Sequence, residues 1–355
     1  MIKYLGSKRL LLPRILAVIQ ALSPSGTVLD LFAGTSRVGH ALKRLGYQVV
    51  ANDHNRYAAE LARCYVQADR DRWLAEATER LAELDALPGV PGWFTETYCV
   101  ASRFFQPHNG ARIDAIREAL TAPAPPELQA ILLVALLEAA DRVDSTTGVQ
   151  MAYLKAWAPR SHQAMRLRVP DLLPGSGRAI CGDALDAAHT RADIAYLDPP
   201  YNQHKYLGNY HIWESLVCWD KPEVYGVARK RVDCRSRKSA FNAKRGARDA
   251  LAAVVDRITA PHLVVSFSDE GFLNRDQIEE ILLPKGEILA IEVDYPRYVG
   301  ARIGIFNPSG VRTGQVSHLR NTEVLYVVSK DLAALERARA AGRDPGAAIG
   351  APRRR

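Results

Sequence analysis

Cysteine is scarce in this chain, and the five residues that occur form no CxxC pair. They are irregularly spaced, at Cys64, Cys99, Cys181, Cys218 and Cys234. An odd number of cysteines without paired spacing argues against a disulfide scaffold and against a cysteine-rich zinc site. We therefore expect reduced thiols, a cytoplasmic location and no bound metal.

Long hydrophobic runs are also absent. The longest, Ala130–Leu137, is much shorter than the roughly 20 apolar residues that a membrane-spanning helix needs. The first residues of the chain show no signal-peptide pattern. These features predict a protein with no membrane partner.

Acidic residues are outnumbered, with 39 Asp and Glu against 47 Lys and Arg and a formal net charge of +8. A basic surface attracts acidic polymers such as nucleic acids, although many basic proteins bind none. The 355 residues suffice for one large domain or two smaller ones with a hydrophobic core.

The most informative stretch is the apolar run Ile194–Leu197 followed by Asp198, Pro199, Pro200 and Tyr201. The run predicts a buried strand, and the two prolines must end it because proline cannot continue a hydrogen-bonded ladder. The Asp198 carboxylate and the Pro199 carbonyl are two acceptors on a rigid frame, which suits the two N–H groups of an amine on a nucleic-acid base. Tyr201 offers a face on which a flipped base can stack. The alternative is an ordinary turn at a strand end.

Two earlier strands also contain acids, Asp30 in the first and Asp53 at the end of the second. Val28–Phe32 leads into a glycine turn at Gly34 and then a helix, and Gln48–Asp53 is the next strand. A dinucleotide fingerprint would have glycine where Ser36 stands, which argues against a nicotinamide cofactor. Asp53 is placed to bind two ribose hydroxyls or, alternatively, to cap the next helix.

These segments together resemble amino-group DNA methyltransferases that use S-adenosylmethionine, of the adenine-N6 type in the D12 (Dam-like) class. The resemblance extends from about Ile2 to Lys330. It rests on segments that occur in the order of the family, namely Tyr4 with Lys8, Asp30–Gly34, Asp53, Asp183, Asp198–Tyr201 and Ser268–Gly271.

The resemblance implies a role for each of these residues. Lys8 is expected at the carboxylate of S-adenosyl-L-methionine and Asp30 at its ammonium group, while Asp183 would accept a hydrogen bond from its adenine amine. The implied cofactor-binding residues are Tyr4, Lys8, Asp30, Phe32, Gly34, Asp53, Asp183 and Asp198, and the implied catalytic residues are Asp198, Pro199, Pro200 and Tyr201.

The implied fold is α/β, a Rossmann-like methyltransferase with a mixed seven-stranded sheet flanked by helices. Residues 1–68 and 178–330 would form the catalytic domain, and residues 69–177 a mainly helical insert that recognises the target. Within the insert, residues 153–168 mix basic with aromatic side chains. Residues 331–355 would form a C-terminal helix and a basic tail.

Basic residues are concentrated in an insert at about residues 203–250, next to the Asp-Pro-Pro-Tyr motif. Such a cluster suits a clamp on DNA phosphates, and the alternative is a solvated loop. The candidate DNA-binding residues are Lys205, Arg235, Arg237, Lys238, Lys244 and Arg245. A second basic loop, residues 295–315, contains Arg297, Tyr298, Arg302 and Arg312 and is also expected near DNA.

The sequence therefore predicts a site-specific enzyme that flips adenine out of double-stranded DNA and methylates N6, with a restriction endonuclease as a possible partner. Cytosine-N4 methylation on the same fold is an alternative, although that variant more often has serine in place of Asp198. A nicotinamide-dependent oxidoreductase, a non-catalytic DNA-binding protein and an RNA-directed enzyme also stay open. A thermal shift with NAD or with S-adenosylmethionine distinguishes the oxidoreductase from the methyltransferase. A labelled-methyl transfer assay distinguishes the non-catalytic DNA-binding protein from the methyltransferase.

Overall fold

The computed structural model describes residues 1–6, 8–296, 305–306, 312–314 and 320–345. Arg297, Tyr298 and Arg302 of the second basic loop lie outside the described residues, as does the predicted basic tail from residue 346 onward. Among the described residues, no helix has both the length and the apolar character needed to cross a membrane.

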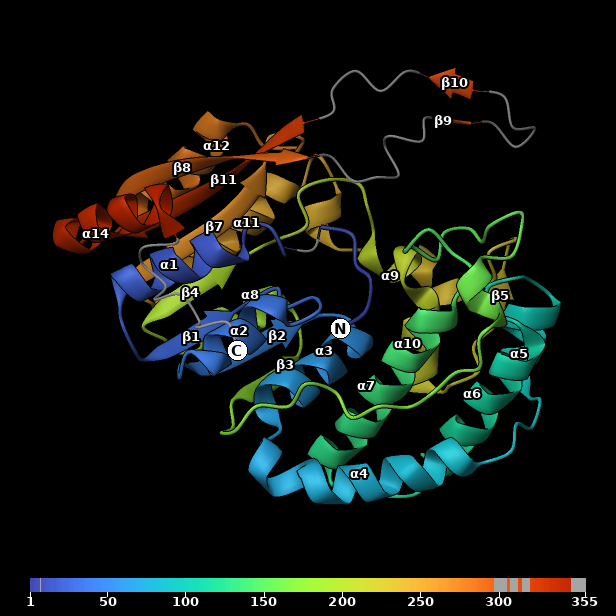
Figure 1. The fold of residues 1–355 in the computed structure, drawn as a ribbon. Helices are drawn as coiled ribbons and strands as arrows, with labels where there is room; N and C mark the ends of the chain where they lie inside the picture. The colour runs from blue at the N-terminus through green and yellow to red at the C-terminus, as the bar shows by residue number, and fades with distance from the viewer. Residues whose placement is uncertain (7, 297–304, 307–311, 315–319, 346–355) are drawn as a thin grey trace. The chain divides into compact units, whose positions relative to one another are not determined.

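Seven strands form one mixed sheet, which confirms the predicted fold class (Figure 1). In spatial order they are β3 (Arg178–Cys181), β2 (Gln48–Asp53), β1 (Thr27–Asp30), β4 (Ile194–Leu197), β7 (His262–Ser268), β11 (Arg320–Ser329) and β8 (Glu287–Pro296). β2 is parallel to β3 and β4 is parallel to β7, whereas β11 runs antiparallel to both β7 and β8. Every residue of β4 is buried, which explains its uninterrupted apolar sequence.

The chain divides into two compact units. The first contains Met1–Ser7, Asp30–Ala187 and His204–Ser239, and the second contains Lys8–Leu29, Ala188–Gln203 and Ala240–Arg355. Each unit is built from chain segments that are distant in sequence.

Helices dominate the first unit. They are α2 (Arg37–Arg44), α3 (Arg56–Ala62) with its π-helical continuation η1 (Arg63–Gln67), α4 (Arg70–Ala86), α5 (Trp93–Thr95), η2 (Glu96–Val100), α6 (Pro107–Ala119), α7 (Pro126–Val143), η3 (Pro159–His162), α8 (Ala184–Ala187), α9 (Tyr206–Asn209) and α10 (His211–Cys218). A short hairpin of β5 (Val224–Tyr225) and β6 (Lys230–Arg231) precedes η4 (Val232–Arg235).

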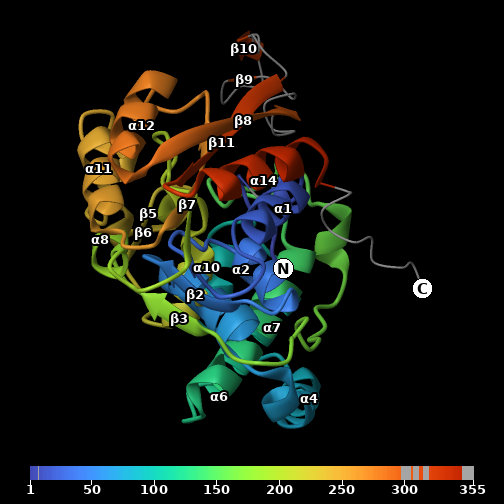
Figure 2. The ribbon, with the colours of Figure 1, turned by 90° about the vertical axis from the view of Figure 1, so that its left-hand side faces the viewer.

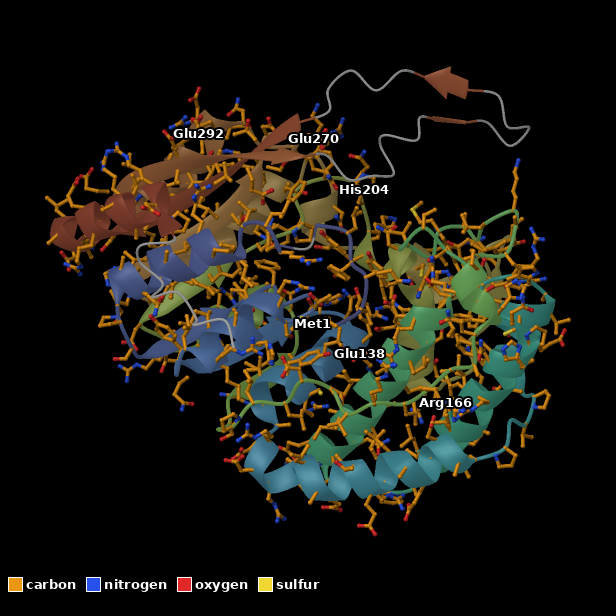
Figure 3. The ribbon with its side chains drawn as sticks, viewed as in Figure 1. Met1, Glu138, Arg166, His204, Glu270 and Glu292 are labelled. Atoms are coloured by element: carbon orange, nitrogen blue, oxygen red, sulfur yellow. The ribbon has the colours of Figure 1, made fainter. Side chains whose placement is uncertain are left out.

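α7 is the central helix of this unit. It packs against α3, α4, α6 and α10, and most of its residues are buried, because a helix surrounded by others must be apolar on all sides. Polar contacts join its side chains to the start of the chain: the amino group of Met1 pairs with Glu138 of α7 (Figure 3), and the Lys3 N–H donates to Asp141 at 3.1 Å.

The second unit carries α1 (Leu12–Leu22), η5 (Ala240–Asn242), α11 (Ala247–Arg257), α12 (Arg275–Leu282), η6 (Leu283–Lys285), α14 (Leu332–Arg343) and the short strands β9 (Ile305–Phe306) and β10 (Arg312–Gly314). α1 and α14 lie side by side, as Figures 1 and 2 both show. The side chain of Asp331 caps α14 by accepting the Ala334 N–H. The predicted C-terminal helix is thus present.

Candidate functional site

The glycine turn after β1 is held by Asp53. The Gly34 N–H donates to Asp53 Oδ2 at 2.9 Å, so the turn is tied to the end of β2. Gly34 has a φ of +52°, and a Cβ at this position would lie 3.3 Å from a ring carbon of Tyr4. Because both the left-handed backbone and the close ring favour glycine, this turn can bring its backbone close to a ligand.

Asp53 also fixes the start of α3. Its Oδ1 accepts the Asn55 N–H at 2.8 Å and the Asn55 side-chain amide at 3.2 Å. Burial raises the pKa of Asp53, while the hydrogen bonds from Asn55 and Gly34 lower it. The sequence left open whether Asp53 binds ribose or supports the following helix. In the structure the N-cap residue of α3 is Asn55, which Asp53 holds without being the cap itself, and ribose binding by Asp53 stays a prediction.

Four tyrosines gather beside this turn, and we call Tyr4, Tyr57, Tyr206 and Tyr210 the tyrosine cluster. The ring of Tyr4 stacks on Tyr206, with centroids 5.2 Å apart, and on Tyr210, with centroids 4.6 Å apart. The hydroxyls of Tyr4 and Tyr57 are 3.1 Å apart. Burial, with Tyr57 and Asp53 adding to it, raises the pKa of Tyr4 well above its usual value, so its hydroxyl stays protonated. Sequence reasoning identified only Tyr4. Tyr206 and Tyr210 lie at the two ends of the short helix α9, the first as its first residue and the second as its C-cap, and no sequence pattern that we used pointed to them.

The other predicted cofactor residues of the first unit have different environments. Asp30 is buried, and its Oδ2 accepts the Gly39 N–H at 3.1 Å. Phe32 is half-buried. Asp183 is exposed and accepts the Leu185 N–H at 2.8 Å, at the start of α8. Because Asp53 is in register with Cys181 across the parallel strands β2 and β3, the structure brings the ends carrying Asp53 and Asp183 to the same edge.

The second unit contains the Asp-Pro-Pro-Tyr motif, directly after β4. Asp198 Oδ1 lies 3.0 Å from the Nζ of Lys8, although the two residues are far apart in sequence. Lys8 also pairs with Glu323 of β11, and Ser266 of β7 donates to Glu323 at 2.8 Å. Sequence reasoning identified Lys8 and Asp198 but assigned no role to Glu323 or Ser266.

The buried position of Asp198 changes its acidity. Burial raises the pKa of Asp198 to about 6; Glu323 acts in the same direction and Lys8 opposes them. Burial also opposes the charge on Lys8, but Asp198 and Glu323 outweigh it and raise the pKa of Lys8 well above its usual value. At neutral pH, Asp198 is therefore mostly ionised and lies beside a lysine that is permanently charged.

Tyr201 is supported by the turn after β7. Its backbone carbonyl accepts the Phe272 N–H at 2.8 Å, and its ring centroid lies 5.8 Å from that of Phe267. Within the turn, the Gly271 N–H donates to the Ser268 carbonyl at 3.0 Å. The predicted Ser268–Gly271 segment and the end of the Asp-Pro-Pro-Tyr motif are thus neighbours, and the half-buried Tyr201 ring has a fixed position.

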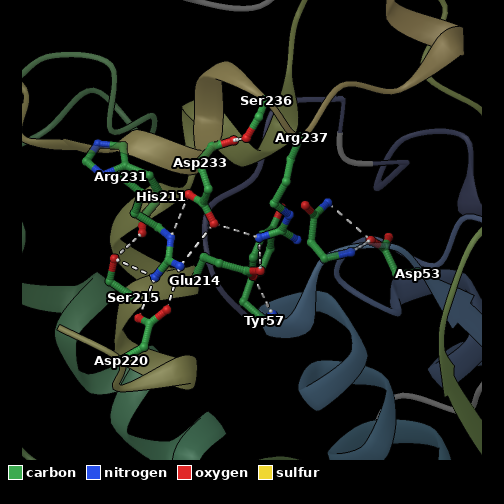
Figure 4. A network of polar contacts seen from close by, with 11 residues as sticks. Asp53, Tyr57, His211, Glu214, Ser215, Asp220, Arg231, Asp233, Ser236 and Arg237 are labelled. Carbon is green, nitrogen blue, oxygen red and sulfur yellow. Dashed lines mark hydrogen bonds and ion pairs between the residues drawn. The ribbon is translucent and has the colours of Figure 1, made fainter. Parts of the chain in front are cut away.

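The basic insert contains two kinds of residue. Lys205, Arg235, Lys238, Lys244 and Arg245 are exposed. In contrast, Arg237 donates to Glu214 at 2.8 Å and lies 3.4 Å from Asp233 (Figure 4). Arg237 therefore has acidic partners within the protein, whereas the exposed five can reach a phosphate without breaking a buried ion pair. DNA contact by any of the six stays a prediction.

Glu214 is the centre of the network in Figure 4. It is fully buried on α10, and it accepts the Tyr57 N–H at 3.1 Å in addition to Arg237. A second arginine, Arg231, donates two hydrogen bonds of 2.7 Å to Asp220 and two, of 3.0 and 3.1 Å, to Asp233. Through Glu214, the bonds from Arg237 and Tyr57 connect the Arg237 segment of the basic insert with α10 and with the start of α3.

No group of three or more His, Cys, Asp or Glu side chains is placed to hold a metal ion anywhere in the part of the chain that the structure describes. The site chemistry available in both units consists of carboxylates, a lysine, tyrosine rings and backbone groups.

A mixed sheet with acids at the ends of β1 and β2 and an Asp-Pro-Pro-Tyr turn after β4 is consistent with the Rossmann-like methyltransferase fold. The model of the family described as D12 class N6 adenine-specific DNA methyltransferase matches residues 4–279. The chain belongs to this family, which confirms the resemblance seen in the sequence.

Named relatives are modification enzymes. The chain is 29% identical over 310 residues to the Type II methyltransferase M.FokI of Planomicrobium okeanokoites, covering 80% of this chain and 47% of that protein. It is 27% identical over 300 residues to the modification methylase StsI of Streptococcus sanguinis, covering 79% and 46%. It is 30% identical over 281 residues to the Type II methyltransferase M.NlaIII of Neisseria lactamica, covering 76% and 83%. The chain thus spans about half the length of the first two relatives and most of the third.

Proposed function

We propose that this chain transfers a methyl group from S-adenosyl-L-methionine to the exocyclic N6 of adenine in double-stranded DNA. The observation that carries the proposal is the Asp198 carboxylate, which is placed on a proline-fixed turn after β4 in a chain of the D12 family. Cytosine-N4 methylation is the alternative, because a cytosine amine presents the same two hydrogens.

The residues of the first unit fit the proposed cofactor chemically. Its ammonium and ribose hydroxyls are donors that need acceptors, and Asp30 and Asp53 are carboxylates at the ends of β1 and β2. Its methionine part needs close approach to the backbone, which the left-handed turn at Gly34 allows. Tyr4 and Phe32 supply apolar surface, and Asp183 would accept from the adenine amine. When bound, the cofactor supplies an electrophilic methyl group on a positively charged sulfur.

The residues of the second unit fit an amine. The nitrogen lone pair of an adenine amine is delocalised into the ring, so the amine is a weak nucleophile. Two acceptors, Asp198 and the Pro199 carbonyl, would hold both amine hydrogens and aim the lone pair, which is catalysis by orientation and electrostatic stabilisation. Lys8 would hold the Asp198 carboxylate in place. Pro200 would fix the turn on which Tyr201 presents its ring to the base.

We further propose that DNA phosphates are bound by exposed residues of the basic insert, that the insert at 69–177 recognises the target sequence, and that the protein acts in the cytoplasm. A restriction endonuclease of the same specificity is a proposed partner, since the relatives in the comparison are named as Type II methyltransferases or modification methylases.

One experiment tests the proposed reaction directly. The gene is expressed in a host without DNA methylation, and its genomic DNA is sequenced for modified adenine and cytosine, with Asp198→Asn as the matched control. We expect N6-methyladenine at one short sequence with the wild type and none with the variant. N4-methylcytosine instead would establish the alternative, and unmodified DNA would contradict both.

A further inference from the structure

Two carboxylates converge on one ammonium group in the second unit. The Nζ of Lys8 lies 3.0 Å from Asp198 Oδ1 and also donates to Glu323 Oε1. Ser266 Oγ donates to the same Glu323 oxygen at 2.8 Å, so Glu323 is held from two strands. With both acids ionised, this cluster has more negative than positive charge.

The three charged side chains differ in access. The side chains of Lys8 and Glu323 are 6% and 8% exposed, whereas that of Asp198 is 21% exposed. The Asp198 carboxylate is therefore more accessible to a ligand than Lys8 or Glu323. This difference favours a role of Glu323 that acts through Asp198.

Three other titratable groups lie near the cluster, namely Tyr196 of β4, Tyr201 of the Asp-Pro-Pro-Tyr motif, and Glu270 of the turn after β7. Burial raises the pKa of Tyr201 above its usual value, so the side chain stays protonated and uncharged at neutral pH. The charge on Asp198 is thus set mainly by three influences, namely burial, the attraction of Lys8 and the repulsion of Glu323.

We propose that Glu323 is a positioning residue for Asp198: by sharing the ammonium of Lys8, it prevents Lys8 from neutralising Asp198 and leaves that carboxylate available to accept the hydrogens of the target amine. The proposal deepens the proposed function and rests on it for the identity of the amine. It assigns Glu323 to the control of Asp198 and not to contact with the substrate.

The physical reason is the competition for one cation. An opposite charge within about 4–6 Å typically lowers the pKa of a carboxyl by about 1–3 units, and a nearby like charge raises it. If Lys8 had Asp198 as its sole acidic partner, the two would form a tight ion pair, and Asp198 would be a weaker acceptor for a neutral amine. Because Glu323 holds the same nitrogen, the attraction of Lys8 is divided between two acids.

The test is a direct titration of Asp198 in the free protein. Carboxyl carbons of aspartate are labelled with carbon-13, the Asp198 signal is identified by its loss in Asp198→Asn, and its pKa is measured by NMR. Glu323→Gln keeps the shape and the contact with Ser266 but removes the charge, and we expect it to lower the pKa of Asp198 by about 1 unit or more. Lys8→Met should raise the same pKa, and Ser266→Ala, which changes no charge, should shift it much less than Glu323→Gln.

An unchanged Asp198 titration in Glu323→Gln, together with an upward shift in Lys8→Met, would overturn the proposal. If Glu323→Gln fails to fold, Glu323→Asp retracts the charge by one methylene, and its shift should have the same sign and a smaller size; no shift there would overturn the proposal equally. The acid limb of the single-turnover rate should move to lower pH in Glu323→Gln, which a merely structural role would not produce. Because the titration needs no substrate, it can succeed even if the wild type transfers no methyl group, and the two failures are distinguishable.

Discussion

Lys8 and Asp198 form a nearly buried ion pair, with 3.0 Å between Nζ and Oδ1. The pair joins the segment just before α1 to the turn after β4, so the Asp-Pro-Pro-Tyr motif is held by a residue from the start of the chain. In the sequence, Lys8 was assigned to the carboxylate of the cofactor. In the structure, Lys8 pairs with two carboxylates of the protein, Asp198 and Glu323, and its contact with the cofactor stays a prediction.

Removing Asp53 should weaken cofactor binding. Asp53→Ala takes away a predicted acceptor of the ribose hydroxyls and also releases the Gly34 and Asn55 N–H groups. We expect S-adenosylmethionine affinity, measured by calorimetry, to fall by about 1–3 kcal/mol, as for the removal of one or two charge-assisted hydrogen bonds. Asp186→Ala, an exposed acid on α8, is the control and should bind normally. Equal affinity of Asp53→Ala and the wild type would remove Asp53 from the cofactor site.

Replacing Arg237 should reduce the folding stability much more than replacing Lys238, although the two are adjacent basic residues. Arg237→Ala leaves the fully buried Glu214 without its cation, and breaking such a pair typically costs about 3–5 kcal/mol of folding free energy. Lys238 is exposed, so Lys238→Ala should change stability by less than about 0.5 kcal/mol. Urea unfolding of both variants decides the matter. A similar, small effect of both would show that the network around Glu214 contributes little to stability.

The exposed bases of the insert should act on DNA of any sequence. Replacing Lys205, Lys238, Lys244 and Arg245 by alanine is expected to weaken binding to all duplexes alike. The log–log dependence of affinity on salt should flatten by about 0.9 for each phosphate that the protein no longer neutralises. Arg339→Ala, on α14 and paired with Glu336, removes a comparable exposed charge as a control. Loss of affinity for a single sequence only would mean that these residues read bases.

Asp141 on α7 should make stability depend on pH. Burial raises the pKa of Asp141 to about 7, with Lys3 opposing this and Asp144 adding to it. Since the unfolded value is about 3.9, folding favours the protonated form, and its stabilisation is present at acid pH and lost as pH rises through about 7. Asp141→Asn should therefore gain stability relative to the wild type above pH 7, by up to roughly 4 kcal/mol.

The measurement for Asp141 is thermal or urea unfolding between pH 5 and pH 9. Asp256→Asn, at an exposed position of α11, should show little change of its relative stability over the same range. A constant difference between Asp141→Asn and the wild type at all pH values would contradict the assignment.

Much of the sheet was predictable because its strands are short apolar runs that end in acids or prolines. β1, β2 and β4 occur where the sequence placed strands, and α4, α6 and α7 lie in the insert that was expected to be mainly helical. The hairpin of β5 and β6 was not predicted, since two-residue strands leave no periodic pattern. α12 was also missed, although Asn274 and Gln277 form a capping box at its start.

The candidate site was predictable residue by residue but not in its pairings. Glu323 is the acid of an ordinary-looking strand, and its contact with Lys8 closes a loop of most of the chain, which no local pattern reveals. The same holds for Arg237, which belongs to a basic run by sequence but to a buried ion pair by contact with Glu214. A run of basic residues therefore does not show which of them are free to contact DNA, because acidic partners such as Glu214 can come from other segments of the chain.

The central claim is that Asp198 and Tyr201 act on the target base and not mainly on folding. Tyr201→Ala removes a stacking face that is typically worth about 1–3 kcal/mol per base. We expect it to reduce the fluorescence increase of 2-aminopurine at the target position and to slow methyl transfer. A normal fluorescence response would mean that the base does not stack on Tyr201.

Asp198→Asn gives the most direct test, because it keeps the shape of the side chain and replaces one acceptor by a donor. The measurement is single-turnover methyl transfer at pH 8, where Asp198 with a pKa of about 6 is ionised, at saturating DNA and S-adenosylmethionine. Circular dichroism and urea unfolding of the same sample verify that the variant is folded. We expect a rate lower by at least about 100-fold, as for the removal of one preorganised electrostatic interaction with a transition state. A folded Asp198→Asn that transfers the methyl group at a rate near that of the wild type would contradict the account.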